Sequence, residues 1–251
     1  MSKKRDARRE AAHAHIAYTR REFVRETMDA VADKKRYRKG CPTPPVLPRF
    51  DSTEIVVADM DSVSVLLAEK GHKAVLDFAS YHHPGGGYED GAWAQEEALC
   101  SESNLYDVLD ALYDEYYLPH RKTHRGGLYT ADALYLRDIV FERDGKQEPC
   151  DVVVAAAPNA KAARGNGIGE EPILSEMVSR VHSIMNAAAE NGAEVLVAGA
   201  FGCGVFDNDP HDVAAAFRDW IDANPGVFRR VVFGIPSGGD NLSVFEEVFS
   251  S

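Results

Sequence analysis

A short apolar run, residues 74–79, leads directly into His83-Pro84-Gly85-Gly86-Gly87, and Gln95-Glu96-Glu97 follows after seven further residues. The run predicts a strand, and a helix is predicted to begin near Ala92. Three consecutive glycines can adopt positive φ and let the backbone approach a ligand without Cβ atoms in the way. A strand, a glycine turn and a helix in this order are typical of α/β proteins, whose ligands lie at the carboxyl ends of the strands.

The rest of the chain continues the alternation of short apolar runs with longer amphipathic stretches. This alternation predicts an α/β fold: a mixed, largely parallel sheet with helices on both faces. The predicted strands are 54–58, 74–79, 134–141, 151–157, 194–198 and 229–235, with a turn at Asp144-Gly145, and the later helices are 61–70, 175–191, 211–224 and 241–249.

The N-terminal segment differs from the body in composition. Residues 1–40 hold 13 Lys/Arg against 6 Asp/Glu, and residues 8–37 lack Gly and Pro. We predict one or two helices there, with Ile16, Phe23, Val24 and Met28 at helical spacing. The prolines within 39–45 end this region. We therefore predict a helical extension, 1–45, packed on a catalytic domain, 46–251.

Charge and cysteine usage exclude several classes of protein. The net charge is −12, so general nucleic-acid binding is not expected, and we interpret the basic N-terminal segment as a solvated helical face. No apolar run is long enough to cross a bilayer and no signal peptide is evident, which predicts a cytoplasmic protein without a membrane partner. The four cysteines show no CxxC pair, so we predict no metal site and no cofactor.

A second glycine-rich stretch, Gly199-Ala200-Phe201-Gly202-Cys203-Gly204-Val205-Phe206, also follows a predicted strand. Backbone N–H groups in such turns bind anions. Neither loop matches the P-loop or the dinucleotide fingerprint GxGxxG. The two loops should meet over one crevice, and together they favour a diphosphate ligand over two empty turns. Phe201 and Phe206 are candidates for stacking on a ribose or base, or for core packing.

Glu96 and Glu97 are candidate acid and base groups. Neighbouring side chains on a helix diverge by about 100°, so the two carboxyls should have different roles. One can protonate a leaving oxygen while the other orients a sugar hydroxyl. A general acid needs an apolar or like-charged setting, for which Trp93, Phe201 and Phe206 are candidates. The alternative is a pair of solvated glutamates. His82 and His83 remain open between bases, metal ligands and structural groups.

The spacing of Pro84-Gly85-Gly86-Gly87 and Gln95-Glu96-Glu97 resembles the signature of microbial-type poly(ADP-ribose) glycohydrolases, which are macrodomain enzymes. The resemblance extends to Ala155-Ala156-Ala157-Pro158-Asn159, to the second glycine loop and to the N-terminal helices. It implies a macrodomain-like sheet and the cleavage of ribose–ribose bonds in ADP-ribose polymers, releasing ADP-ribose from the free end.

The resemblance also implies roles for individual residues. Glu97 is the expected general acid and Glu96 the residue that holds ribose hydroxyls. The expected substrate-binding residues are Gly85, Gly86, Gly87, Gln95, Gly202, Cys203, Gly204, Val205 and Phe206, with Asp61 reading the adenine amine. Asp77 and His83 depart from the pattern, which usually has Asn at both positions.

Two alternatives to a polymer hydrolase remain at this stage. One is an enzyme that removes single ADP-ribose units from ADP-ribosylated protein or nucleic acid. The other is a reader that binds ADP-ribose without cleaving it. The intact pair Glu96-Glu97 argues against the reader.

Overall fold

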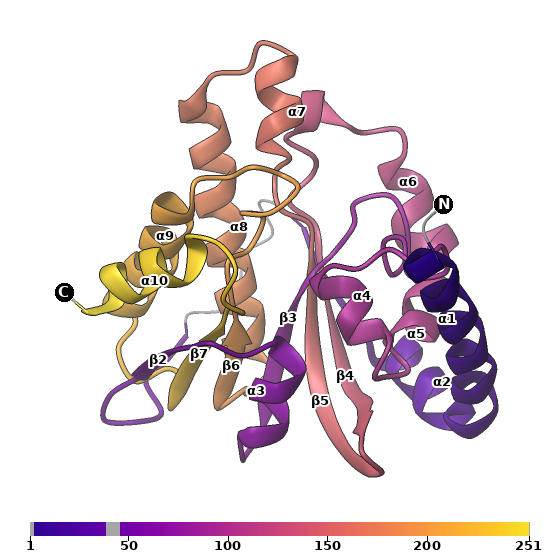
Figure 1. The fold of residues 1–251 in the computed structure, drawn as a ribbon. Coiled ribbons are helices and arrows are strands. Elements are labelled where there is room, and N and C mark those ends of the chain that lie inside the picture. The colour runs from indigo at the N-terminus through magenta and orange to yellow at the C-terminus, as the bar shows by residue number, and fades with distance from the viewer. Residues whose placement is uncertain (1–2, 39–45, 251) are drawn as a thin grey trace.

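The computed structural model describes residues 3–38 and 46–250, and Figure 1 shows their arrangement around one sheet. The sheet has seven strands within these residues, in the order β1-β4-β5-β3-β6-β7-β2. The strands are β1 (Lys35–Tyr37), β2 (Glu54–Ala58), β3 (Lys73–Phe78), β4 (Ala133–Arg143), β5 (Lys146–Ala155), β6 (Val195–Ala198) and β7 (Arg230–Gly234).

The pairing of these strands confirms the predicted mixed, largely parallel sheet. β5, β3, β6, β7 and β2 run parallel to one another, whereas β4 pairs antiparallel with both β1 and β5. The predicted turn at Asp144-Gly145 is confirmed: φ is 52° at Asp144 and 74° at Gly145, and this turn joins β4 to β5 in a hairpin.

Helices cover both faces of the sheet. On one face, Leu76, Leu196 and Phe233 pack in a core with α8 (Glu170–Glu190), α9 (Pro210–Ala223) and α10 (Asn241–Ser250). On the other, Val75, Val197 and Val232 pack with α3 (Ser62–Ala68), α4 (Gln95–Cys100) and α5 (Leu105–Ala111). Both cores are apolar, as burial of each face of a parallel sheet requires.

Shorter elements complete the chain at the end of the sheet where the parallel strands terminate. These are the π-helix η1 (Tyr113–Tyr117), α6 (Leu118–His120), the 3-10 helix η2 (Arg125–Gly127) and α7 (Ala160–Gly165). Sequence analysis did not separate these elements.

The N-terminal segment forms α1 (Lys3–Glu22) and α2 (Val24–Asp33), which lie beside α5 (Figure 1). α1 is attached by Thr19 and Arg20, whose side chains donate to Asp107 at 2.6 and 3.0 Å. Part of the basic charge is therefore neutralised by the acidic body. Of the four apolar residues at helical spacing, Ile16 and Phe23 are buried, whereas Val24 and Met28 are 51% and 66% exposed.

Helix was also predicted through Tyr37, and this was wrong: Lys35–Tyr37 form β1, which pairs with β4. The proposed domain boundary at 45/46 and the proline cluster lie at or within 39–45, outside the described residues. The division into an extension and a catalytic domain stays a prediction.

One irregularity of the sheet creates space at its carboxyl end. β3 remains paired with β5 as far as Phe78 and Ala155, but its pairing with β6 ends at Val75 and Val197. Beyond that point β3 and β6 separate. The two glycine-rich loops leave the sheet on either side of this gap.

None of the helices in the described part of the chain combines the length and the apolar character that a bilayer-spanning segment needs.

Candidate active site

A cavity of about 910 Å³ lies at the carboxyl end of the sheet, above the separation of β3 and β6. Both glycine-rich loops line it, which confirms that they converge on one crevice. Ten of the twelve predicted site residues are among its lining residues: Asp61, Gly86, Gly87, Gln95, Glu96, Glu97, Gly202, Gly204, Val205 and Phe206. Gly85 and Cys203 are not.

The side chain of Gln95 hydrogen-bonds to the edge of β3 at the point where β3 is no longer paired with β6. Its Oε1 accepts the Phe78 N–H at 2.9 Å, and its Nε2 donates to the Leu76 carbonyl at 2.8 Å and to Ser62 Oγ at 3.2 Å. Both amide protons are thereby used. Gln95 pairs backbone groups that the opened sheet would otherwise leave unsatisfied, and it fixes the first residue of α4 against β3.

Glu96 points from α4 back toward the end of β3. Its Oε2 accepts the Ser80 N–H at 2.7 Å, while its Oε1 is buried without a hydrogen-bond partner among the described residues. Burial, followed by the nearby charge of Asp77, raises the pKa of Glu96 well above its usual value, against the opposing hydrogen bonds from Ser80 and Gly85.

Asp77 lies beneath these glutamates on β3 and is fully buried. Neither of its carboxyl oxygens has a partner in the described chain. Burial, with a smaller contribution from Glu97, raises the pKa of Asp77 well above its usual range. A protonated carboxyl at this position can donate a hydrogen bond, as an Asn side chain does. A protonated Asp77, which stands where the family pattern usually has Asn, therefore still provides a hydrogen-bond donor.

Glu97 occupies the third position of α4 and is 7% exposed. Its Oε1 accepts the Gly87 N–H at 2.9 Å, and its Oε2 accepts the Ala94 N–H at 2.8 Å. The second bond is one half of a capping box, because Ala94 precedes the first residue of α4. Glu96 and Glu97 thus bond to different backbone groups, as the helix geometry predicts.

The first glycine loop is shaped around the two glutamates. Gly86 has φ +62°, and a Cβ atom there would lie 2.6 Å from Glu97 Oε1 and 2.9 Å from Glu96 Oε2. The Gly86 N–H donates to the His83 carbonyl and the Gly87 N–H to Glu97. The prediction that this loop offers free amides to a phosphate was therefore wrong for Gly86 and Gly87: the protein's own groups accept them.

The second glycine loop does offer free donors. The N–H groups of Gly204, Val205 and Phe206 donate to no protein acceptor in the described residues. Val205 is 83% exposed, and all three residues line the cavity. Gly202 closes the turn beneath them: its φ is +75°, and a Cβ there would lie 2.5 Å from Ala157 Cβ. Three successive amides of this kind form an anion-binding concavity.

Gly85 and Cys203 lie behind the two loops. A Cβ at Gly85 would lie 2.7 Å from the Tyr106 ring and 3.2 Å from Cys100 Sγ, so this glycine allows close packing against α4 and α5. Cys203 Sγ contacts the Phe201 carbonyl at 3.7 Å, and burial raises the pKa of its thiol to about 12. Both residues support the loops from outside the cavity.

Asp61 caps α3 and lines the cavity, where Arg143 also contacts it. Its Oδ1 accepts from the Ser64 N–H at 2.9 Å and from Arg143 Nη2 at 3.1 Å, and its Oδ2 accepts from Ser64 Oγ. Burial alone would raise the pKa of Asp61, but these donors lower it. Arg143 also binds Glu102 with two hydrogen bonds. Sequence analysis missed Arg143 and Glu102, because only the β4 pairing brings Arg143 to this edge.

The three candidate aromatic residues have different positions. Phe201 is fully buried against Phe78, with ring centroids 5.6 Å apart, so its role is core packing. Phe206 and Trp93 line the cavity, and Trp93 is 56% exposed under the guanidinium of Arg8. Of the two Phe residues, only Phe206 is placed to stack on a ligand.

No group of three or more His, Cys, Asp or Glu side chains is arranged to hold a metal ion in the residues that the structure describes. Cys100 and Cys150 are buried free thiols.

Comparison with known proteins agrees with this geometry. Residues 10–144 match the family model described as microbial-type PARG, catalytic domain, where PARG is poly(ADP-ribose) glycohydrolase. No curated protein matches the sequence at a significant level.

Solved bacterial structures match nearly the whole chain. Poly(ADP-ribose) glycohydrolase from Thermomonospora curvata is 29% identical, with a TM-score of 0.85 over 98% of this chain and 100% of that one. The same enzyme bound to the inhibitor ADP-HPD gives 0.82 at 29% identity, over 97% and 99%. The Deinococcus radiodurans enzyme in complex with ADP-ribose is 28% identical, with a TM-score of 0.79 over 89% of this chain and 97% of that one.

Proposed function

The chain belongs to the microbial-type poly(ADP-ribose) glycohydrolase family, and from that premise we propose that its crevice holds the terminal unit of an ADP-ribose polymer. The volume of about 910 Å³ suits one nucleotide-sized ligand rather than a stretch of polymer, which supports action at the free end. The product is then ADP-ribose, the ligand bound by the Deinococcus radiodurans relative.

The observation that carries this proposal is the pairing of Glu97 with the second glycine loop across one cavity. The free amides of Gly204, Val205 and Phe206 hold the diphosphate, and Phe206 lies against the neighbouring ribose. This assignment needs no basic side chain, which fits an acidic protein. Gly86 and Gly87 contribute close approach of the backbone instead of hydrogen-bond donors.

Asp61 is proposed to accept the adenine amine. Its Oδ1 already has two donors, but Oδ2 has one, which leaves a lone pair on Oδ2 for a ligand. Arg143 holds this carboxyl in place. Glu96, with one oxygen fixed by Ser80, orients the hydroxyls of the distal ribose.

The proposed chemical step uses Glu97 as the general acid. Protonated Glu97 donates its proton to the bridging oxygen as the bond from ribosyl C1″ to that oxygen breaks, leaving an oxocarbenium-like ribosyl group. The carboxylate that forms accepts the Gly87 and Ala94 N–H groups, so it is stabilised as its charge develops. Glu97 then takes a proton from the water that adds to C1″. The leaving ribose hydroxyl keeps the first proton.

The proposal is tested with wild-type protein on two substrates, ADP-ribose polymer and a mono-ADP-ribosylated protein. Chromatography of the products should show free ADP-ribose from polymer, appearing from the first turnovers without intermediate oligomers. Release from the mono-ADP-ribosylated protein alone would support the single-unit hydrolase. Binding of ADP-ribose without any release would support the reader, and either of these outcomes would contradict the proposal.

A further inference from the structure

A basic surface lies beside the crevice in a chain whose net charge is −12. Residues 118–128, Leu-Pro-His-Arg-Lys-Thr-His-Arg-Gly-Gly-Leu, hold three Lys or Arg and no carboxylate. The His82-His83 pair lies against this segment, since the His82 and His124 rings are 4.7 Å apart. We call the exposed residues His83, Arg121, Lys122 and His124 the basic rim.

The charges of the basic rim are not neutralised by the protein. In the part of the chain that the structure describes, neither Arg121 nor Lys122 forms an ion pair with a carboxylate. Burial lowers the pKa of the adjacent His82, and the neighbouring groups His124, His83 and Arg121 lower it further. The adjacent charges of Arg121 and Lys122 thus have no carboxylate partner among the described residues.

His83 connects the basic rim to the crevice. It lines the cavity, and its carbonyl accepts the Gly86 N–H at 3.1 Å in the turn that leads to the Glu97 contact. Its Nδ1 lies 3.3 Å from Arg121 Nη2. Because Arg only donates, Nδ1 is the acceptor, which leaves Nε2–H as a donor for a ligand.

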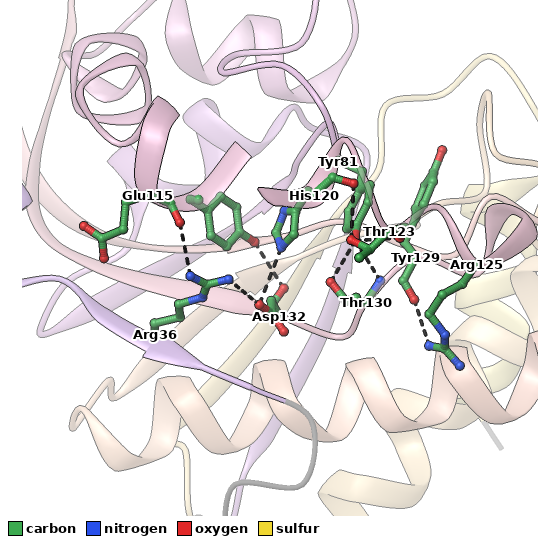
Figure 2. A network of polar contacts seen from close by, with 10 residues as sticks. Arg36, Tyr81, Glu115, His120, Thr123, Arg125, Tyr129, Thr130 and Asp132 are labelled. Atoms are coloured by element: carbon green, nitrogen blue, oxygen red, sulfur yellow. Dashed lines mark hydrogen bonds and ion pairs between the residues drawn. The ribbon is translucent and has the colours of Figure 1, made fainter. Parts of the chain in front are cut away.

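The basic rim is held in place by a network around Tyr81, which Figure 2 shows from close by. The Tyr81 hydroxyl lies 3.0 Å from Thr123 Oγ1 and 2.8 Å from Thr130 Oγ1. Its ring stacks on His120 at 4.4 Å and on Tyr129 at 4.2 Å.

Asp132 anchors the far side of the same network. It accepts from Arg36 Nη2 at 2.6 Å and lies 3.5 Å from His120 Nε2 (Figure 2). The segment that carries Arg121, Lys122 and His124 is therefore held by Tyr81, just after β3, and by Asp132, just before β4. A binding surface that is already ordered loses less entropy when a ligand arrives.

We propose that the basic rim binds the diphosphate of the second unit of the polymer, the unit that remains on the chain after the terminal ADP-ribose is released. This inference rests on the proposed function. In the polymer, the oxygen that Glu97 protonates belongs to the adenosine ribose of that second unit, and its diphosphate follows a few covalent bonds further along. A ligand leaving the crevice past Gly86 and His83 meets the basic rim next.

The size and surroundings of the basic rim favour this ligand over nucleic acid. Four residues, of which His83 lines the cavity, match one diphosphate in number, whereas the acidic body repels an extended polyanion. The crevice then binds the terminal unit by amides, and the basic rim adds an electrostatic contact that only a polymer can make.

The test compares a rim variant, Arg121→Glu/Lys122→Glu, with a control variant of equal charge change, Arg25→Glu/Lys70→Glu. Arg25 is exposed on α2, Lys70 is exposed shortly before β3, and neither residue lines the cavity. Thermal unfolding checks that both variants fold. Each is assayed on long polymer and on a 4-nitrophenyl glycoside of ADP-ribose, which has no second diphosphate.

For the rim variant we expect the KM for polymer to rise about tenfold at low salt, since two cations that neutralise phosphate are replaced by carboxylates that repel it. The kcat on polymer and both constants on the aryl glycoside should match those of the control variant. The salt dependence of KM for polymer should also decrease in the rim variant.

A KM for polymer within twofold of the control variant would overturn the inference and leave the proposed function intact. Wild-type protein that releases no ADP-ribose from either substrate would instead contradict the proposed function. If duplex DNA or RNA inhibits the wild type but not the rim variant, and the KM for polymer is unchanged, the basic rim is a nucleic-acid site and the inference is wrong.

Discussion

Gly86→Ala is the substitution whose effect on the catalytic carboxylate follows most directly from the structure. The new Cβ would lie 2.6 Å from Glu97 Oε1, whereas ordinary contacts begin at 3.4 Å. Glu97 must therefore move by about 0.8 Å, and a misplacement of about 1 Å at a reacting group costs roughly 10²-fold in rate. The movement also weakens the Gly87 hydrogen bond. We expect kcat on polymer to fall about a hundredfold.

Gly145→Ala is a matched control for the backbone strain. Gly145 has φ +74°, close to the +62° of Gly86, but a Cβ there meets no atom within 4 Å. Both substitutions carry the left-handed penalty of about 1–2 kcal/mol. Each should lower the melting temperature by about 2–4 °C per kcal/mol.

The assay is ADP-ribose release from polymer at saturating substrate, with thermal unfolding of both variants in parallel. Only Gly86→Ala should lose activity. The reasoning is refuted if Gly86→Ala keeps a kcat within threefold of Gly145→Ala, because Glu97 would then tolerate displacement from the position that the glycine loop imposes.

Three further predictions concern the supports of the site. Gln95→Met leaves two backbone groups of β3 unpaired, at a cost of about 1–3 kcal/mol each, so the melting temperature should fall by at least about 4 °C. An unchanged melting temperature in calorimetry would contradict the role of Gln95 in pairing these backbone groups. Burial raises the pKa of Asp77, so the folded state holds a proton that the unfolded chain releases above about pH 3.9. The stability of the wild type therefore declines as the pH rises from about 3.9 through the raised pKa of the folded state. Asp77→Asn removes that decline: the difference in melting temperature should be small near pH 4 and should grow in favour of Asn toward pH 8, whereas a difference independent of pH would refute the assignment. Gly202→Ala places a Cβ 2.5 Å from Ala157 and should weaken ADP-ribose binding about tenfold in titration calorimetry. Gly204→Ala, whose Cβ meets nothing within 4 Å, should bind ADP-ribose within twofold of the wild type. Equal affinities of the two variants would show that the turn at Gly202 does not position the amides of residues 204–206.

The layered sheet could be predicted from the sequence because its strands are short apolar runs bounded by glycine or acidic residues. Residues 54–58 coincide with β2 from end to end. β1 could not be predicted in this way, because Lys35–Tyr37 continue an uninterrupted helical pattern and become a strand only through pairing with β4.

The composition of the site was predictable, but its hydrogen bonding was not. Three glycines after a strand suit an anion, and nothing local shows that the acceptor is the chain's own Glu97, ten residues after Gly87. The side-chain amide of Gln95 likewise hydrogen-bonds to β3, whose edge is unpaired there because the pairing with β6 ends at Val75. Such long-range pairing depends on how strands separate, and local sequence patterns do not encode it.

The basic rim illustrates a related limit. The histidines at 82 and 83 stood in the sequence without an assignment, and Arg121 and Lys122 lie about 40 residues further along. Tyr81 brings the two segments together through Thr123 and Thr130. Local sequence does not show that His83 lies beside Arg121 and Lys122, because these long-range contacts of Tyr81 bring the two segments together.

The central claim is that Glu97 acts by moving a proton to the leaving oxygen, and Glu97→Gln tests it with two leaving groups. Gln keeps the size of the side chain but cannot supply that proton, and general acid catalysis contributes about 10²–10⁴-fold. On ADP-ribose polymer, whose leaving group is a ribose hydroxyl, we predict a loss of kcat in that range. On the 4-nitrophenyl glycoside, whose leaving group departs without protonation, bond cleavage should be nearly as fast as in the wild type, measured as nitrophenolate release in a single turnover with enzyme in excess. Equal losses on both substrates would contradict the claim and would place Glu97 outside the proton transfer.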